Sequence, residues 1–241
     1  MAEAVRALST VDEHDLYPLH EEDDVPQGFA HYQQASYLAG ALQALRPELW
    51  VTSDSCLYWE EGETNRYLAP DVAVFSGPAP DPLPSVWLAW RDAPLLFVGE
   101  VASPSSTETD RGAKLFTYEQ ALRVPEYLYV DGFTSKVQLW RLVEGHYQAV
   151  RWGPGRRLWS EYLQAWFGFD EDDFLRLYDA DGRMILTHAE AEQRAEAEAR
   201  RAEAEARRAE AEARRADEAE RRLAEMTAEL ERLRRTAGGE Q

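Results

Sequence analysis

The chain has 241 residues, of which 44% are hydrophobic and 29% charged, and its formal net charge is −19 at pH 7. This length allows one medium-sized domain with an extension, and the single cysteine, Cys56, excludes an internal disulfide and a thiolate metal cluster. The N-terminus lacks the charged-then-apolar pattern of an export signal and no run of about 18 apolar residues occurs, so we expect a soluble, cytoplasmic protein without a membrane span.

The negative charge is divided unevenly along the chain. Residues 188–241 hold 12 arginines and 15 acidic residues, whereas residues 1–187 hold 14 basic and 30 acidic residues, a net charge of −16. Because non-specific affinity for DNA comes mainly from neutralising phosphates, an acidic body disfavours tight general DNA binding. Lysine is nearly absent, with Lys114 and Lys136 against 24 arginines, and an ammonium is not interchangeable with a guanidinium at a catalytic position.

The first half of the chain predicts one helix and several short strands. Residues 31–45 carry apolar side chains at helical spacing and predict a helix that ends before Pro47. Apolar runs predict strands at residues 49–52, 56–60, 67–75 and 95–101. Residues 76–94 contain five prolines and predict a long loop.

The second half predicts a helix followed by further strands. Ser105 and Glu108 form a capping box, so we expect a helix that starts there and stops before Pro125. Strands are predicted at 127–131 and in a hairpin of 137–143 and 147–152. The aromatic segment 158–178 is expected to close the domain against its core.

The composition changes abruptly at Thr187, which forms a second capping box with Glu190. We therefore expect two domains, 1–187 and a charged tail 188–241, with one long helix over 187–235. Apolar residues at heptad a and d spacing occur near the end of this helix, at Ala216, Ala219, Leu223, Met226, Leu230 and Leu233. Two interpretations stay open, a solvated single helix and a coiled coil; we expect a homo-oligomer formed through residues 216–235.

Two carboxylates adjoin the central apolar runs. Asp71 follows Pro70 at the start of one run, and Glu100 lies at the end of another. The helix that follows carries Asp110, Lys114 and Tyr118 at four-residue steps, which is one face of a helix. Two acids on neighbouring strands with a lysine nearby can hold Mg²⁺ for phosphodiester cleavage. Simpler readings exist: a turn residue for Asp71, a solvent-facing strand end for Glu100 and core packing for Tyr118.

These motifs resemble the PD-(D/E)XK nuclease superfamily and, within it, a large bacterial branch of the restriction-endonuclease type. The resemblance covers roughly residues 15–178. Its motifs are Pro70-Asp71, Glu100-Val101-Ala102-Ser103-Pro104-Ser105, the helix with Asp110, Lys114 and Tyr118, and Val124-Pro125-Glu126-Tyr127-Leu128-Tyr129-Val130-Asp131. It implies a mixed α/β fold, in which a sheet of four or five strands is flanked by helices, here extended by the long C-terminal helix or coiled coil.

The resemblance also implies an activity and a site. The activity is a Mg²⁺-dependent endonuclease, with Mn²⁺ able to substitute, that hydrolyses DNA phosphodiester bonds. Asp71, Glu100 and the carbonyl of Val101 are then the metal ligands, and Lys114 positions or activates the attacking water. Asp110 and Tyr118 are expected to orient Lys114.

One departure from the superfamily pattern leaves an alternative open. The superfamily lysine stands two residues after the acid, where this chain has Ala102. In one interpretation Lys114, on the following helix, takes the role of the superfamily lysine. In the other, the domain is a catalytically silent module that acts through protein contacts and coiled-coil oligomerisation. His31 is interpreted as a helix-start or structural residue, and Glu22, Tyr127 and Asp131 have no assigned role.

Overall fold

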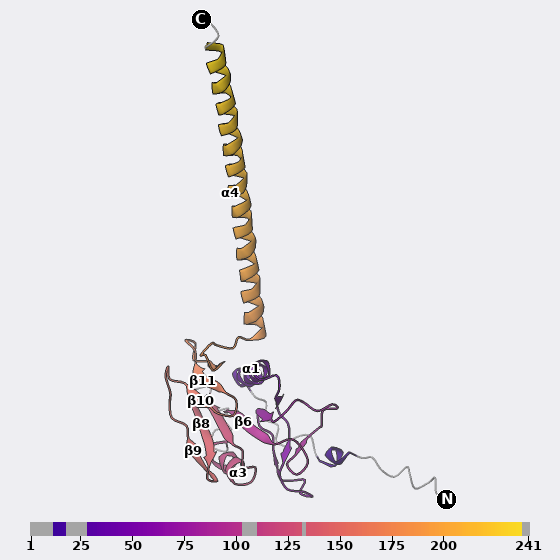
Figure 1. Cartoon of the computed structure of the whole chain (residues 1–241). Helices are drawn as coiled ribbons and strands as arrows, with labels where there is room; N and C mark the ends of the chain where they lie inside the picture. The colour runs from indigo at the N-terminus through magenta and orange to yellow at the C-terminus, as the bar shows by residue number, and fades with distance from the viewer. Residues whose placement is uncertain (1–11, 18–27, 103–109, 132–133, 238–241) are drawn as a thin grey trace, which may run out of the picture. The chain divides into compact units, whose positions relative to one another are not determined.

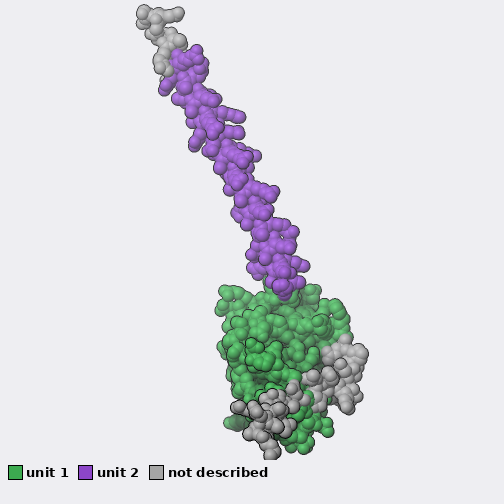
Figure 2. Space-filling view, turned by 90° about the vertical axis from the view of Figure 1, so that its right-hand side faces the viewer, with its two compact units in different colours: residues 1–187 green, residues 188–241 purple. Residues whose placement is uncertain are grey.

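The computed structural model describes residues 12–17, 28–102, 110–131 and 134–237 (Figure 1). It divides into two compact units, residues 1–187 and 188–241, coloured separately in Figure 2. Each unit is described by itself below.

A six-stranded mixed sheet forms the centre of the first unit, with the strand order β1-β4-β6-β7-β8-β9. The strands are β1 (Trp50–Thr52), β4 (Val72–Phe75), β6 (Leu95–Ala102), β7 (Glu126–Asp131), β8 (Lys136–Val143) and β9 (His146–Ala149). Strands β6 and β7 are parallel, and the other neighbouring strands are antiparallel. The expected α/β class is confirmed, although the sheet has six strands where the resemblance implies four or five.

Side chains alternate between the two faces of this sheet and enter two different cores. Val72 and Val74 pack in one core with the helix α1 (Phe29–Leu45). Ala73 and Phe75 pack in the other core, to which Tyr118 of helix α3 (Leu115–Gln120) also belongs. Helix α1 ends where predicted, because Arg46 N–H bonds to Leu42 O and Pro47 follows. The two helices therefore belong to opposite faces of the sheet.

The aromatic segment after the hairpin folds into a three-stranded antiparallel sheet that packs against the α1 core, as predicted. Its strands are β10 (Leu158–Ser160), β11 (Ala165–Phe169) and β12 (Leu175–Tyr178). Phe167 stacks on Phe97 of the central sheet with ring centroids 5.8 Å apart. Tyr37 of α1 is tied to the same layer, since its hydroxyl donates to Ile185 O and accepts from Leu177 N–H.

The prediction of one strand over residues 67–75 is wrong. That run is divided between β3 (Tyr67–Leu68), which pairs with β2 (Leu57–Tyr58), and β4 of the central sheet. Pro70 lies at the break and has no N–H with which to continue a ladder. The proline-rich segment 76–94, predicted as loop, also contains a two-residue strand, β5 (Trp87–Leu88), parallel to β2. The 3₁₀ turn η1 (Glu13–Leu16) precedes these elements.

The predicted start of the helix, at the Ser105 capping box, lies outside the described residues. In the described part it starts as a π-helical turn, η2 (Asp110–Lys114), and continues as α3. It ends before Pro125, as predicted, with Ala121 N–H and Leu122 N–H both bonded to Thr117 O. π-helical turns inside α-helices are rare and occur frequently at functional sites.

The second unit contains one helix, α4 (His188–Ala237), of 50 residues. At 1.5 Å per residue it is about 75 Å long. Exposed ion pairs join Arg194 to Glu198 at 3.0 Å, Glu196 to Arg200 at 3.6 Å and Glu203 to Arg207 at 3.4 Å. Among the described helices of the chain, none is both long and apolar enough to cross a membrane.

Candidate active site

Strand pairing brings the two candidate carboxylates to facing positions on neighbouring strands. Val72 of β4 pairs with Gly99 of β6 in antiparallel register, so Asp71 and Glu100 stand opposite each other at the next position. Both side chains are buried, with 5% and 2% of their surface exposed. Buried carboxylates are rare unless they are paired, hydrogen-bonded or bound to a metal.

Asp71 is held by two donors from different elements. Its Oδ2 accepts from Val101 N–H at 2.6 Å, and its Oδ1 lies 2.8 Å from Nε2 of His31. His31 belongs to α1 and is 4% exposed. The sequence favoured a structural or helix-start role for this histidine; the structure adds a direct contact with the candidate site.

Glu100 is held by two residues of the following helix. Lys114 Nζ lies 3.2 Å from Oε2, and the Tyr118 hydroxyl donates to Oε1 at 2.5 Å. Residues four apart share a helix face, which is why both reach the same carboxylate. The expectation that Tyr118 orients Lys114 needs correction, since the described contact of its hydroxyl is with Glu100.

Tyr118 also packs in the core, which agrees with the simpler reading of this residue. Its side chain is fully buried, and its ring lies 5.1 Å from that of Tyr127, centroid to centroid. Burial, followed by the adjacent Glu100 carboxylate, raises the pKa of Tyr118 well above its usual value. The phenol therefore keeps its proton at neutral pH and acts as a hydrogen-bond donor.

Ala102, at the position of the superfamily lysine, is 1% exposed and belongs to the same core as Tyr118. Successive side chains of a strand point to opposite faces, so those of residues 98, 100 and 102 share one face of β6. Lys114 approaches Glu100 on this face from the helix, with 18% of its side chain exposed. Lys114 therefore contacts Glu100 from the helix, whereas a lysine at position 102 would lie next to Glu100 on the same face of β6.

The other candidate residues lie as follows. Asp110 is the first residue of η2, but its side chain lies outside the described residues, as does all of Glu22. Tyr127 is a core residue between the rings of Tyr118 and Trp140, and Asp131 caps the turn after β7 by accepting from Thr134 N–H at 3.1 Å. Val101 contributes its N–H to Asp71, as described above. Among the described residues, no group of three or more His, Cys, Asp or Glu side chains is arranged to hold a metal ion.

Sequence reasoning did not single out Glu126 individually, although it lies in one of the quoted motifs. Its carboxylate is fully buried and accepts from Arg141 at 2.9 and 2.8 Å and from Glu161 N–H at 3.1 Å, with Ser160 Oγ as a further donor. The glutamate joins β7 and β8 to the β10–β11 connection. An acid that directly follows Val124-Pro125 and precedes an apolar strand is the signal that could have found it.

A mixed sheet with buried acids facing each other on neighbouring strands belongs to the restriction-endonuclease-like type of domain. The family profile described as "Uma2: Putative restriction endonuclease" matches residues 22–170 of the sequence, which is more than half of the chain. The chain belongs to this family, and the resemblance drawn from its motifs is confirmed.

Comparison with solved structures gives a distant similarity. A crystal structure titled as a putative nuclease belonging to DUF820 from Anabaena variabilis ATCC 29413 aligns with 12% sequence identity and a TM-score of 0.44. The alignment covers 58% of this chain and 75% of that one. Among curated proteins, no significant match is found.

Proposed function

We propose that the chain is a Mg²⁺-dependent endonuclease that hydrolyses DNA phosphodiester bonds in the cytoplasm. The family match supports nuclease chemistry in general. The observation that carries the specific proposal is the environment of Glu100, which faces Asp71 across two strands and lies 3.2 Å from Lys114 Nζ. Paired acids with an ammonium beside them are suited to a phosphate group and the cation that accompanies it.

The donor set fits a hard divalent cation. Asp71 and Glu100 supply carboxylate oxygens, the ligands that Mg²⁺ prefers, and each oxygen can accept more than the one hydrogen bond described for it. Two carboxylates are sufficient because Mg²⁺ usually keeps several waters and adds phosphate oxygens. Asp71 and Glu100 would hold the ion, with the Val101 carbonyl as a third oxygen. When bound, the ion supplies a Lewis acid that offsets charge on the phosphate.

The other residues act through these carboxylates or on the substrate. Lys114 offsets the charge of the scissile phosphate and positions the attacking water. Tyr118 fixes Glu100 through Oε1, which directs Oε2 toward Lys114. Val101 N–H and His31 fix Asp71 in the same way from the other side. Groups held in one orientation before the substrate arrives need no reorganisation during the reaction.

The test is cleavage of plasmid DNA by the full chain in Mg²⁺ or Mn²⁺, with EDTA as a metal-free control. Asp71→Asn and Glu100→Gln should each reduce cutting by more than about 100-fold while circular dichroism stays unchanged. Glu61→Gln removes one exposed charge in a turn and should cut like the parent. Equal cutting by the parent and Glu100→Gln would reject the proposal.

A catalytically silent module is the second candidate, and the net charge of −16 on residues 1–187 is the observation that favours it. Calorimetric titration of Mg²⁺ separates the two. Binding that disappears in Asp71→Asn supports the endonuclease, whereas no binding to the parent protein favours the silent module.

We further propose that the chain self-associates through residues 216–235. Leu223, Met226 and Leu230 are 67%, 65% and 56% exposed on α4. They recur at heptad a and d spacing, which matches a second copy of the same stripe. A parallel pair of such helices would cover these side chains and give two nuclease-like heads.

A further inference from the structure

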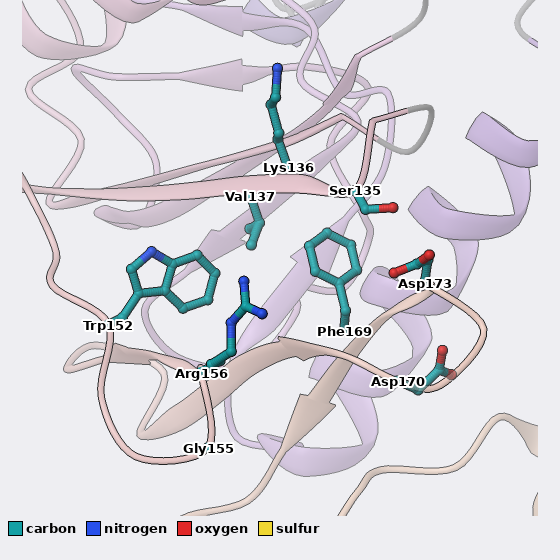
Figure 3. A pocket seen from close by; sticks show the side chains of 9 residues that line it. All are labelled: Ser135, Lys136, Val137, Trp152, Gly155, Arg156, Phe169, Asp170 and Asp173. Carbon is teal, nitrogen blue, oxygen red and sulfur yellow. The ribbon is translucent and has the colours of Figure 1, made fainter.

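A cavity of about 550 Å³ lies between the start of β8, the turn at 152–156 and the β11–β12 connection (Figure 3). Its walls include the rings of Trp152 and Phe169, the guanidinium of Arg156 and the carboxylate of Asp173. We propose that this cavity binds one unpaired nucleobase of a nucleic-acid strand, and guanine in preference to thymine. The identity of that strand as DNA rests on the proposed function.

The aromatic side chains provide the stacking surface. Trp152 is a large side chain that is 50% exposed, and Phe169 is partly buried on β11 beside it (Figure 3). Base–aromatic stacking is a contact between uncharged ring faces, so it adds affinity that does not require neutralising a phosphate. A base-binding cavity thereby lets an acidic chain hold a nucleic acid that its phosphate contacts alone would hold weakly.

The turn that carries Arg156 is sterically restricted. Gly153 N–H bonds to Arg157 O at 2.8 Å, and Gly155 and Arg156 have φ values of +67° and +53°. A Cβ on Gly153 would lie 2.8 Å from the Trp166 ring, so the close approach requires glycine there. Arg156 is one of seven non-glycine residues at positive φ in the described part of the chain, a conformation that fixes the direction of this turn. In Figure 3 the Arg156 guanidinium points into the cavity between the two aromatic rings.

The charged groups that remain available to a ligand are the Arg156 guanidinium and the Asp173 carboxylate, and Ser135 adds a hydroxyl to the lining. Asp170 is engaged, because it pairs with Arg176 at 2.7 Å and accepts from two backbone N–H groups at 3.0 Å. Within the described residues, neither Arg156 nor the carboxylate of Asp173 has a side-chain hydrogen bond or ion pair. Guanine offers O6 and N7 as acceptors to an arginine and its N1–H and N2–H₂ as donors to a carboxylate, whereas thymine lacks this pairing.

Strand register places the start of β8, at the rim of the cavity, two strands away from the end of β6 that follows Glu100. Ala102 of β6 pairs with Asp131 of β7, which pairs with Lys136 of β8. Two strand spacings amount to about 10 Å. Strand alternation turns Val137 toward the cavity and Lys136 away from it, toward the sheet face that carries Glu100 (Figure 3). A strand that crosses this sheet edge can bring a phosphate to Lys136 and a neighbouring base into the cavity.

The test uses ¹⁹F NMR of the full chain labelled with 5-fluorotryptophan. The chain has eight tryptophans, and the signal missing in Trp152→Phe identifies Trp152. Titration with dGMP should move the Trp152 signal at concentrations about 10-fold lower than dTMP requires, a ratio within the range expected for one good pairing to a base edge. Deoxyribose 5-phosphate should leave the signal in place. No movement with dGMP, or equal movement with dTMP or the sugar phosphate, overturns the proposal.

Matched variants distinguish binding inside the cavity from a general effect of the protein's charge. Arg156→Gln and Asp173→Asn should each weaken dGMP binding about 10-fold, whereas Arg151→Gln and Asp172→Asn, which remove the same charges outside the cavity, should leave it unchanged. An equal effect of Arg151→Gln and Arg156→Gln overturns the assignment. The readout is independent of cleavage: dGMP binding without DNA cutting rejects the proposed endonuclease alone, and cutting without a Trp152 response rejects the cavity alone.

Discussion

His31 and Asp71 meet between α1 and the central sheet, with Nε2 of the imidazole 2.8 Å from Oδ1 of the carboxylate and both side chains at least nine-tenths buried. If Asp71 is ionised its carboxylate only accepts, and the hydrogen of this bond then belongs to Nε2. The second ring nitrogen, Nδ1, is buried and has no hydrogen-bond partner among the residues that the structure describes. The contact therefore orients one acid of the candidate site at the expense of an unsatisfied nitrogen on the other side of the ring.

Replacement of His31 should change both stability and metal affinity. His31→Leu leaves Asp71 Oδ1 buried without its donor, so the free energy of unfolding in urea should fall by about 1–3 kcal/mol. Affinity for Mn²⁺, measured by calorimetry, should fall by about 10–100-fold because a ligand has lost the group that orients it. His31→Gln, which keeps a donor, should recover much of the affinity. Unchanged Mn²⁺ binding in a folded Leu variant would show that the histidine is structural only.

Lys114 should affect rate more than metal binding. Lys114→Ala should lower the rate of DNA cleavage by about 100-fold or more, since it removes a charge directed at the reacting phosphate. The Kd for Mg²⁺ should stay within about 3-fold of the parent value, which corresponds to a change of less than about 1 kcal/mol in binding free energy. Lys114→Arg keeps the charge but not the compact ammonium and should recover only part of the rate. Full activity of Lys114→Ala would exclude the relocated-lysine interpretation.

Glu126 should contribute strongly to the free energy of unfolding. Its fully buried carboxylate pairs with Arg141, so Glu126→Ala should cost about 3–5 kcal/mol by leaving the guanidinium without its buried partner. Glu161 contacts the same arginine at 2.7 Å but is exposed, and Glu161→Gln should change stability by less than about 1 kcal/mol. Chemical denaturation of the two variants measures the difference, and similar losses would contradict the assignment.

Asp170 should contribute to the acid stability of the domain. Burial acts to raise its pKa, but hydrogen bonds with Arg176, Phe174 N–H and Asp172 N–H outweigh burial, and the pKa of Asp170 is lowered overall. A carboxyl group with a lowered folded-state pKa stabilises the fold above the unfolded value of about 3.9, and this stabilisation disappears as the pH falls through the folded-state pKa. Asp170→Asn should therefore be less stable than the parent at pH 6, and the difference should shrink below about pH 4. Melting of both proteins across this range, with Asp172→Asn as control, provides the measurement; a constant difference would contradict it.

The apolar stripe of α4 should determine the oligomeric state. Light scattering should give a dimer for the full chain and a monomer for residues 1–187. Leu223→Glu with Leu230→Glu should give a monomer, because like charges would replace the a positions of the seam. Ala204→Glu, outside the stripe, should leave the dimer intact. A monomeric full chain would identify α4 as a solvated single helix.

Elements with strong local signals were predictable from the sequence. The helical spacing of residues 31–45 and the apolar run 95–101 correspond to α1 and β6. The approach of Lys114 to Glu100 also follows from a lysine on the helix next along the chain. Periodicity therefore located most of the central sheet, and the acids beside apolar runs indicated Asp71 and Glu100, whose catalytic role stays a prediction.

The remaining features depend on partners far away in the sequence. The two-residue strand β5 exists because Trp87 and Leu88 pair with β2, and no pattern within a proline-rich segment indicates that pairing. The break at Pro70 was missed because the residues on both sides of it are apolar. The contact of His31 with Asp71 joins residues 40 positions apart, and local periodicity contains no information about such contacts.

The backbone amide of Val101 links the site to the register of β4 against β6. Asp71 reaches this N–H only when Val72 faces Gly99, and a slip of one residue would turn Glu100 to the α1 side of the sheet. The site therefore exists only when the central strands are paired: a chain with native helices but unpaired central strands has no paired acids. A partly folded chain of that kind would lack the proposed metal site, so the proposed chemistry would require the completed central sheet.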